Sequence, residues 1–215
     1  MHVPKSFQQE DSTVLHELIA KYPLASLIAY SATGIEVNHI PFFLNKSKGK
    51  LSLQGHIAKA NPLWKLIKDK SQVLLVFHGP NCYISPNYYP TKKEQGKVVP
   101  TWNYVAVHVK GLLSYRFDTE FKLDMLNHLT IQHEQNQDKP WSITDAPMQY
   151  IQRMLAAIVG LEIEILSITG KWKVSQNQPE INKQGIVAGL SNEETSDSLN
   201  IANLVQTHMI GGVEL

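Results

Sequence analysis

Residues 53–62 combine groups that could bind a phosphate. An expected strand ends at about Ile57, and Asn61 followed by Pro62 is typical of a helix start. The free backbone N–H groups of a helix start, together with the ammonium group of Lys59, favour an anion. The same residues also fit an ordinary helix cap beside a solvated lysine, and His56 equally fits a structural hydrogen-bonding role. Spacing alone leaves both interpretations open.

Two large aromatic residues lie close together in residues 99–104. Trp102 and Tyr104 flank Asn103. Rings of this size suit stacking on a planar ligand, and the amide suits hydrogen bonding to the edge of that ligand. The alternative is that both rings pack under a sheet as part of the core.

Residues 170–177 carry two lysines at the end of an expected strand. Because strand side chains alternate, Lys171, Lys173 and Ser175 are expected on one side, where they offer two positive charges and a hydroxyl. A phosphate or an anionic ring would bind such a set. A solvated edge strand protected by lysines has the same pattern.

Metal and nucleophile chemistry find little support. The chain has nine histidines, but His128 and His133 are five apart and do not share one helix face. The single cysteine, Cys82, excludes a cysteine-based zinc site, and no nucleophile elbow, Walker loop or dinucleotide fingerprint occurs. The sequence therefore predicts no metal and no named catalytic residue, and it leaves open whether the protein is an enzyme.

Composition sets the class of protein. The chain has 215 residues, a formal net charge of +1, 43% hydrophobic and 18% charged residues, which fits a globular protein without a strong field toward nucleic acid or acidic membranes. No apolar run approaches the roughly 18 residues that a membrane helix needs. The first twenty residues lack the pattern of a signal peptide, so a cytoplasmic location is expected.

Short aliphatic segments separated by turns predict a mainly antiparallel sheet with added helices, an α+β protein. Strands are expected at 24–31, 35–44, 51–57, 72–79, 101–117 and 161–173. Helices are expected from a cap at Asp11 or Ser12 to Tyr22, at about 62–68, at 118–135, from 145 onward and in the tail. Strands in pairs argue against a doubly wound parallel sheet and favour a closed antiparallel barrel. A flat ligand would then bind outside the barrel or at a subunit seam.

The tail is expected to pack on the barrel or on a second subunit. Its helix after Ser191 opens with Glu193, Glu194 and Asp197, and such carboxylates would repel DNA phosphates. The expected division is a domain of residues 1–178, followed by a helical tail of residues 179–215.

Six motifs occur in order along the chain and together resemble one family. They are His2-Val3-Pro4, Asn38-His39-Ile40-Pro41, residues 55–64 from Gly55 to Trp64, Tyr83-Ile84-Ser85-Pro86, residues 97–104 and residues 170–177. This set resembles the PaiB family of FMN-binding negative transcriptional regulators. The resemblance implies an FMN-binding split barrel akin to pyridoxamine phosphate oxidases, a homodimer, and one FMN per subunit at the dimer seam.

The resemblance also implies which residues contact FMN. The strand at Asn38, His39 and Ile40 would lie along the isoalloxazine ring. Gly55, His56 and Lys59, with the start of the Asn61 helix, would hold the phosphate, a task shared with Lys171 or Lys173. Contacts beside the ring or from the second subunit are assigned to Trp102, Asn103, Lys173 and Gln176.

Three functions are compatible with this resemblance. The first is an FMN-binding regulator, in which DNA binding is implied by the family name alone and is not supported by the charge of the chain. The second is a flavin-dependent oxidoreductase of unknown substrate. The third is a split barrel that binds haem or another flat ligand, with His39 or His56 as a ligand.

Overall fold

The computed structural model describes residues 1–47 and 49–209, which form two compact units. The first unit contains residues 1–18, 78–107 and 169–209, and the second contains 19–77 and 108–168. The boundary falls inside three long strands, β6 (Gln72–Ile84), β7 (Thr101–Arg116) and β8 (Ile158–Lys173). Each unit is therefore built from segments that are distant in the sequence.

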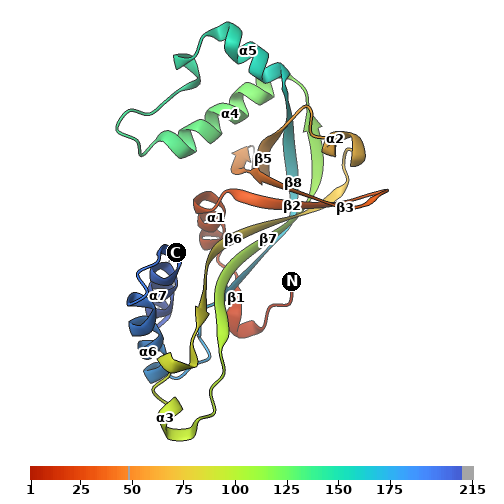
Figure 1. Ribbon diagram of the computed structural model, residues 1–215. Helices are drawn as coiled ribbons and strands as arrows, with labels where there is room; N and C mark the ends of the chain where they lie inside the picture. The colour runs from red at the N-terminus through yellow and green to blue at the C-terminus, as the bar shows by residue number, and fades with distance from the viewer. Residues whose placement is uncertain (48, 210–215) are drawn as a thin grey trace. The chain divides into compact units, whose positions relative to one another are not determined.

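Five further strands complete the set: β1 (Gln8–Gln9), β2 (Leu24–Ser31), β3 (Gly34–Pro41), β4 (Phe43–Ser47) and β5 (Lys50–Ala58). The helices are α1 (Ser12–Lys21), α2 (Leu63–Leu66), α3 (Lys92–Gln95), α4 (Thr119–Glu134), α5 (Met148–Ala156), α6 (Glu180–Ser191) and α7 (Ser196–Met209) (Figure 1). Among the described residues, no helix is long and apolar enough to span a bilayer.

The strands form one antiparallel-type sheet in the order β3-β2-β6-β7-β8-β5-β4, with β1 paired to β8. The expectation of a closed barrel is wrong, because in the described strands no ladder joins β3 to β4 at the two ends of this order. The physical reason lies at the junction of these two strands. Only Phe42 separates β3 from β4, so these consecutive strands cannot pair with each other: the Phe42 N–H still donates to the Pro23 carbonyl in the β2 register, and Phe43 already pairs with Gln54 of β5.

The second unit owes its core to alternation along its strands. In β2 the residues Ala25, Leu27 and Ala29 are buried, while the residues between them are more exposed. Helix α4 is capped by Asp118, whose carboxylate accepts from the Phe121 N–H at 2.9 Å.

Helices α4 and α5 belong to the same unit (Figure 1). They are joined by the buried Lys122, whose ammonium group donates to the Leu155 carbonyl at 2.6 Å. This bond satisfies a buried charge with a backbone acceptor and fixes the two helices against each other.

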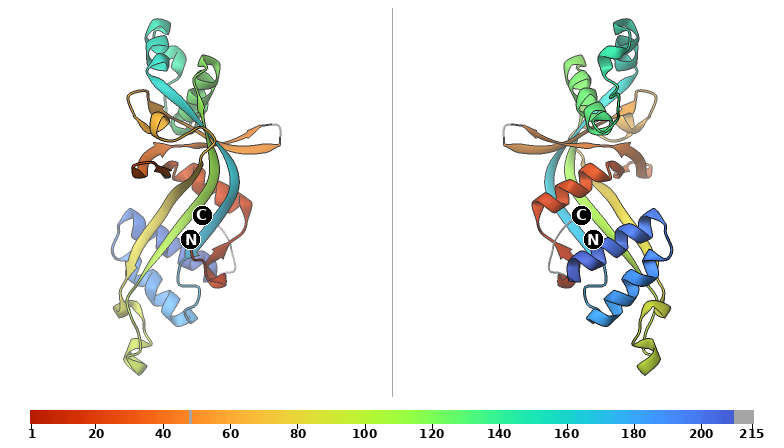
Figure 2. Two further views of the ribbon diagram at one scale, coloured as in Figure 1. Left: turned by 90° about the vertical axis from the view of Figure 1, so that its right-hand side faces the viewer. Right: turned by 90° about the vertical axis from the view of Figure 1, so that its left-hand side faces the viewer.

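The first unit is held together by the tail helices. Helices α6 and α7 run side by side in both views of Figure 2 and in Figure 1. Gly185 and Gly189 of α6 face Tyr88, so closely that added Cβ atoms would lie 2.0 Å from the Tyr88 carbonyl oxygen and 2.3 Å from its ring. The tail thus packs within this unit. That residues 1–178 form a domain of their own stays a prediction, and residues 210–215 of the expected tail lie outside the described residues.

Candidate functional site

The residues predicted to contact a ligand divide between the two units. The second unit holds Asn38, His39, Ile40, Gly55, His56, Lys59 and Asn61. The first unit holds Trp102, Asn103, Lys171, Lys173 and Gln176. Within each unit the structure shows which of these side chains are free for a ligand and which are bound to the protein itself.

Asn61 is the fixed point of the first group. Its Nδ2 donates to Asn38 Oδ1 at 2.7 Å, and its Oδ1 accepts from the Leu63 N–H at 2.9 Å. One amide therefore joins β3 to the start of α2, and it holds the corner in which Lys59 lies. The helix itself is a single turn and ends at Leu66 instead of about Lys68, because Ile67 adopts an extended conformation. So short a helix contributes little dipole to anion binding.

Lys59 has a fixed backbone and a free side chain. Its N–H donates to the Ala157 carbonyl at 2.7 Å, and its own carbonyl accepts from Trp64 Nε1 at 3.0 Å. The side chain is exposed and has no partner in the part of the chain that the structure describes. A pinned backbone with an unpaired ammonium group is suited to receiving a phosphate oxygen.

His56 points toward α4. Its ring lines a pocket of about 310 Å³ with Leu126, Leu129 and Trp141, and its buried Nδ1 has no hydrogen-bond partner among the described residues. Burial lowers the pKa of His56 from its ordinary value and favours the neutral imidazole. An orphaned ring nitrogen in a pocket is available to a ligand.

Gly55 and the β3 residues have mainly structural surroundings. A Cβ on Gly55 would lie 2.7 Å from the Pro41 carbonyl oxygen, so this glycine permits a close approach of two chain segments. Ile40 is buried in the core. His39 is exposed, and its Nδ1 lies 3.1 Å from the Ser26 hydroxyl on the neighbouring strand. Asn38 is half-buried and bound to Asn61.

The first unit presents an exposed aromatic pair beside two lysines. Trp102 is 55% exposed and meets the ring of Tyr83 edge to face, with centroids 6.0 Å apart. Lys173 Nζ donates to the Trp102 carbonyl at 2.6 Å and to the Thr101 hydroxyl. Lys171 Nζ lies 5.1 Å from the centroid of the Tyr104 ring.

Burial, followed by the charge of Lys171, lowers the pKa of Lys173. The positive charge of Lys171 therefore disfavours the charged form of Lys173. An anion bound near the two lysines would be attracted by both.

Three predicted polar contacts are used inside the protein. Asn103 is buried and exchanges hydrogen bonds with the Ser175 hydroxyl, at 2.9 and 3.2 Å. The expectation that Ser175 lies beside the two lysines is wrong, because β8 ends at Lys173 and Ser175 takes a left-handed backbone conformation with φ of 63°. Gln176 binds the backbone of Val174 and Trp172. These three side chains therefore bind neighbouring parts of the protein. The side chains that remain available to a ligand on this surface are those of Trp102, Lys171 and Lys173.

Sequence reasoning missed two groups of residues. Tyr83 lies in one of the motifs, but its sequence neighbours do not indicate that its ring is the partner of Trp102. The pocket under α4 also escaped notice, because Leu126 and Trp141 come from a helix and a loop far from His56 in the sequence. No local spacing signals such a pocket.

Residues 1–167 match the family described as "Putative FMN-binding domain". The chain belongs to this FMN-binding family. It is 27% identical over 206 residues to the protease synthase and sporulation protein PAI 2 of Bacillus subtilis, covering 96% of this chain and 97% of that protein. It is 31% identical over 230 residues to an uncharacterized protein of Emericella nidulans, covering 90% and 92% of the two chains.

A solved structure has a similar fold. The FAD and haem binding protein of Mycobacterium smegmatis aligns with a TM-score of 0.56 at 15% identity, covering 85% of this chain and 80% of that one. The resemblance to the PaiB family is confirmed, as is the split-barrel fold, with the correction that the sheet is open. FMN, the cofactor implied by the resemblance, is confirmed as the ligand of this family.

Proposed function

We propose that this protein is a homodimeric FMN-binding regulator of the PaiB type, with flavin occupancy as its input. The observation that carries the proposal is the unpaired ammonium group of Lys59 on a backbone pinned at its N–H and its carbonyl. The flavin phosphate would bind there, beside the corner that Asn61 and Asn38 form. His56 lies on β5, three residues before Lys59, and its unpartnered Nδ1 is the second polar group that we assign to the ligand.

The flavin ring would lie against the aromatic and basic surface of the first unit of the partner subunit. Trp102 is exposed and would stack on the flavin ring, and its edge-to-face contact with Tyr83 would hold it in position. Lys171 and Lys173 would stabilise negative charge on a reduced ring. Bound flavin would supply electron or hydride transfer, and these residues would orient it and tune its charge.

An apolar sheet surface in the second unit supports the homodimer. Leu24, Tyr30, Ile35 and Val37 of β2 and β3 expose large side chains, and Tyr30 and Ile35 are 79% and 69% exposed. Tyr30 pairs with Ile35, and Val37 with Ile28, across the two strands, and exposed apolar side chains grouped in this way are typical of an interface. A second copy of the chain is the partner we propose for it.

The regulatory part of the proposal draws on the printed name of the Bacillus relative, which links that protein to protease synthesis and sporulation. Regulation by flavin requires two conformations with different flavin affinity. The net charge of +1 and the acidic start of the tail favour action through a protein partner over direct DNA contact.

Titration with FMN and with riboflavin tests the phosphate site. Lys59→Met should weaken FMN about tenfold or more, through loss of one charge-assisted contact, and leave riboflavin binding unchanged. Lys68→Met, at an exposed lysine beyond α2, is the matched control and should bind FMN normally. Equal FMN affinity in Lys59→Met and the parent protein would refute this site.

Three further measurements test the rest of the proposal. Light scattering should give the mass of a dimer, and a monomer at micromolar concentration would refute the seam. A Soret band in the purified protein would favour haem over FMN. Gel shifts across a salt series separate specific DNA binding from charge attraction, because only the latter vanishes near physiological ionic strength.

A further inference from the structure

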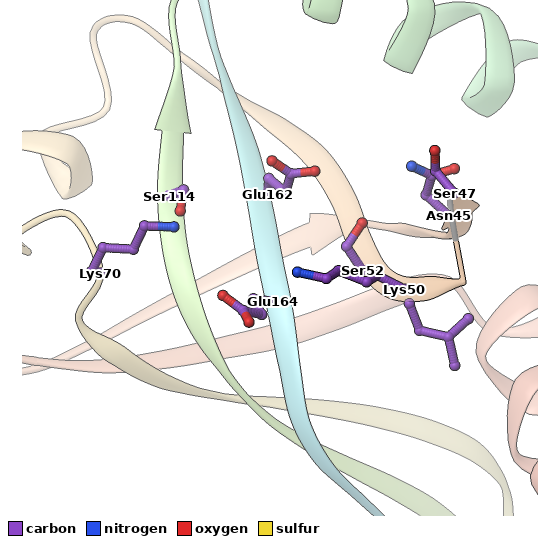
Figure 3. A pocket seen from close by; sticks show the side chains of 9 residues that line it. Asn45, Ser47, Lys50, Ser52, Lys70, Ser114, Glu162 and Glu164 are labelled. Carbon is purple, nitrogen blue, oxygen red and sulfur yellow. The ribbon is translucent and has the colours of Figure 1, made fainter.

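A second pocket lies in the second unit, away from every residue assigned to FMN above. Its volume is about 390 Å³, and it is lined by residues of β4, β5, β7 and β8 together with Lys70 (Figure 3). Pairing across the sheet brings Asn45 opposite Ser52, and Ser52 opposite Glu164. A row of polar side chains therefore crosses three strands and forms one wall of the pocket.

Three of the charged side chains in this pocket form no ion pair with other residues of the protein that the structure describes. Lys50 and Lys70 reach in from opposite sides of Glu164 (Figure 3). Within residues 1–47 and 49–209, neither lysine forms a salt bridge, and the Glu164 carboxylate has no side-chain partner. Three charged groups thus face a common space without neutralising one another directly.

The fourth charge, Glu162, is already compensated. Its carboxylate accepts from Arg116 at 2.8 Å and from Gln54 at 3.1 Å. Arg116 is itself held by Asp118 and lies over the Phe121 ring, 4.2 Å from its centroid. This network fixes one wall of the pocket, as a preformed binding site requires. The charge left for a ligand is two positive groups and one negative group.

Lys70 has an unusual backbone conformation. Its φ is +61°, in the left-handed region that lysine seldom adopts, and its N–H donates to the Leu113 carbonyl at 2.7 Å. Glycine or asparagine would adopt this conformation at less cost. A strained lysine at the mouth of a pocket suggests that its side chain has a use there.

We propose that this pocket binds a small amino dicarboxylate, of the class to which acidic amino acids belong. Two carboxylates on the ligand match Lys50 and Lys70, and its ammonium group matches Glu164. The hydroxyls of Ser47, Ser52 and Ser114 and the amide of Asn45 add hydrogen bonds to the same ligand. The site is independent of FMN, because it shares no residue with the flavin contacts.

Calorimetry on the full chain at low ionic strength tests the proposal, with L-glutamate as the probe. Glutarate lacks the ammonium group, and 4-aminobutyrate lacks one carboxylate, so each should bind about tenfold more weakly than L-glutamate. Glu164→Gln should weaken L-glutamate by a similar factor, whereas glutarate should bind as well as before or more tightly, because the variant removes a negative charge beside the ligand. Lys70→Asn, which suits the left-handed backbone, should weaken L-glutamate and glutarate alike.

Lys46→Met is the matched control, since Lys46 lies between Asn45 and Ser47 on β4 and faces away from the pocket by alternation. FMN titration of all variants separates this site from the flavin site, because none of them should change flavin affinity. Absence of heat with millimolar L-glutamate would overturn the proposal. So would glutarate binding as tight as that of L-glutamate, or full affinity in Glu164→Gln.

Discussion

The substitution Gly185→Ala tests how closely α6 packs against the turn that contains Tyr88. In an unhindered helix, alanine in place of glycine stabilises by about 1 kcal/mol. Here the new Cβ would lie 2.0 Å from the Tyr88 carbonyl oxygen, whereas such contacts need at least 3.0 Å, so the helix or the turn must move by about 1 Å. Overpacking costs roughly 1 to 3 kcal/mol, and the upper part of this range, about 2 to 3 kcal/mol, applies here because a backbone oxygen cannot rotate away.

The two effects together predict a net loss of about 1 to 2 kcal/mol in the free energy of unfolding, or several degrees in Tm. Urea denaturation and a thermal melt would measure both quantities. Gln184→Ala is the matched control, because Gln184 is exposed on the same helix and should unfold like the parent protein.

Gly189→Ala supplies a second arm. Its clash is with the Tyr88 ring, so adding Tyr88→Ala should relieve the clash and produce a measurable coupling energy in a double-mutant cycle. If Gly185→Ala unfolds at the same denaturant concentration as the parent or a higher one, α6 does not pack as tightly as argued.

Two further predictions concern buried polar groups. Asn103→Ala should lower the free energy of unfolding by about 1 to 3 kcal/mol, because it leaves the buried Ser175 hydroxyl without its partner. Urea denaturation of the double variant Asn103→Ala, Ser175→Ala checks this. Its loss of unfolding free energy should be smaller than the sum of the losses in the two single variants. His56 has a lowered pKa in the folded protein, so below its ordinary pKa of about 6.5 the unfolded chain binds the extra proton and stability falls as the pH falls. Urea titrations between about pH 5 and pH 7.5 should therefore show a smaller slope with pH in His56→Gln, and an unchanged slope would contradict the burial argument.

Periodicity in the sequence predicts most strands because their burial alternates. The expected strand at residues 24–31 matches β2 at both ends, and the expected strand at residues 101–117 matches β7 to within one residue. The end of β8 was harder to interpret. Nothing in the order Lys173-Val174-Ser175 indicates the left-handed turn that sends Ser175 into the interior.

The candidate site was only partly accessible to sequence reasoning. Short motifs point to Lys59 and Trp102, and both side chains are exposed, but their contact with FMN stays a prediction. Asn103 and Gln176 were found by the same motifs, yet their amides bind the protein itself. Whether a polar side chain faces a ligand or a neighbouring strand depends on tertiary pairing, which spacing along one strand does not encode.

Closure of the sheet and the pocket between Lys50 and Lys70 depend on residues far apart in sequence. The chain passes from β2 to β5 at Phe42, which bonds to Pro23, while Phe43 pairs with Gln54. The pocket needs β4, β5, β7 and β8 to be placed side by side before its charges meet. A single sequence offers no pattern for either feature.

The passage of β6, β7 and β8 through both units has a practical consequence. Neither unit is a continuous stretch of polypeptide, so no single cleavage by a protease releases one of them intact. Shortened versions that begin or stop at a unit boundary would sever a strand in mid-length and expose its unpaired edge to aggregation. Gene duplication or shuffling could therefore transfer the two units only together.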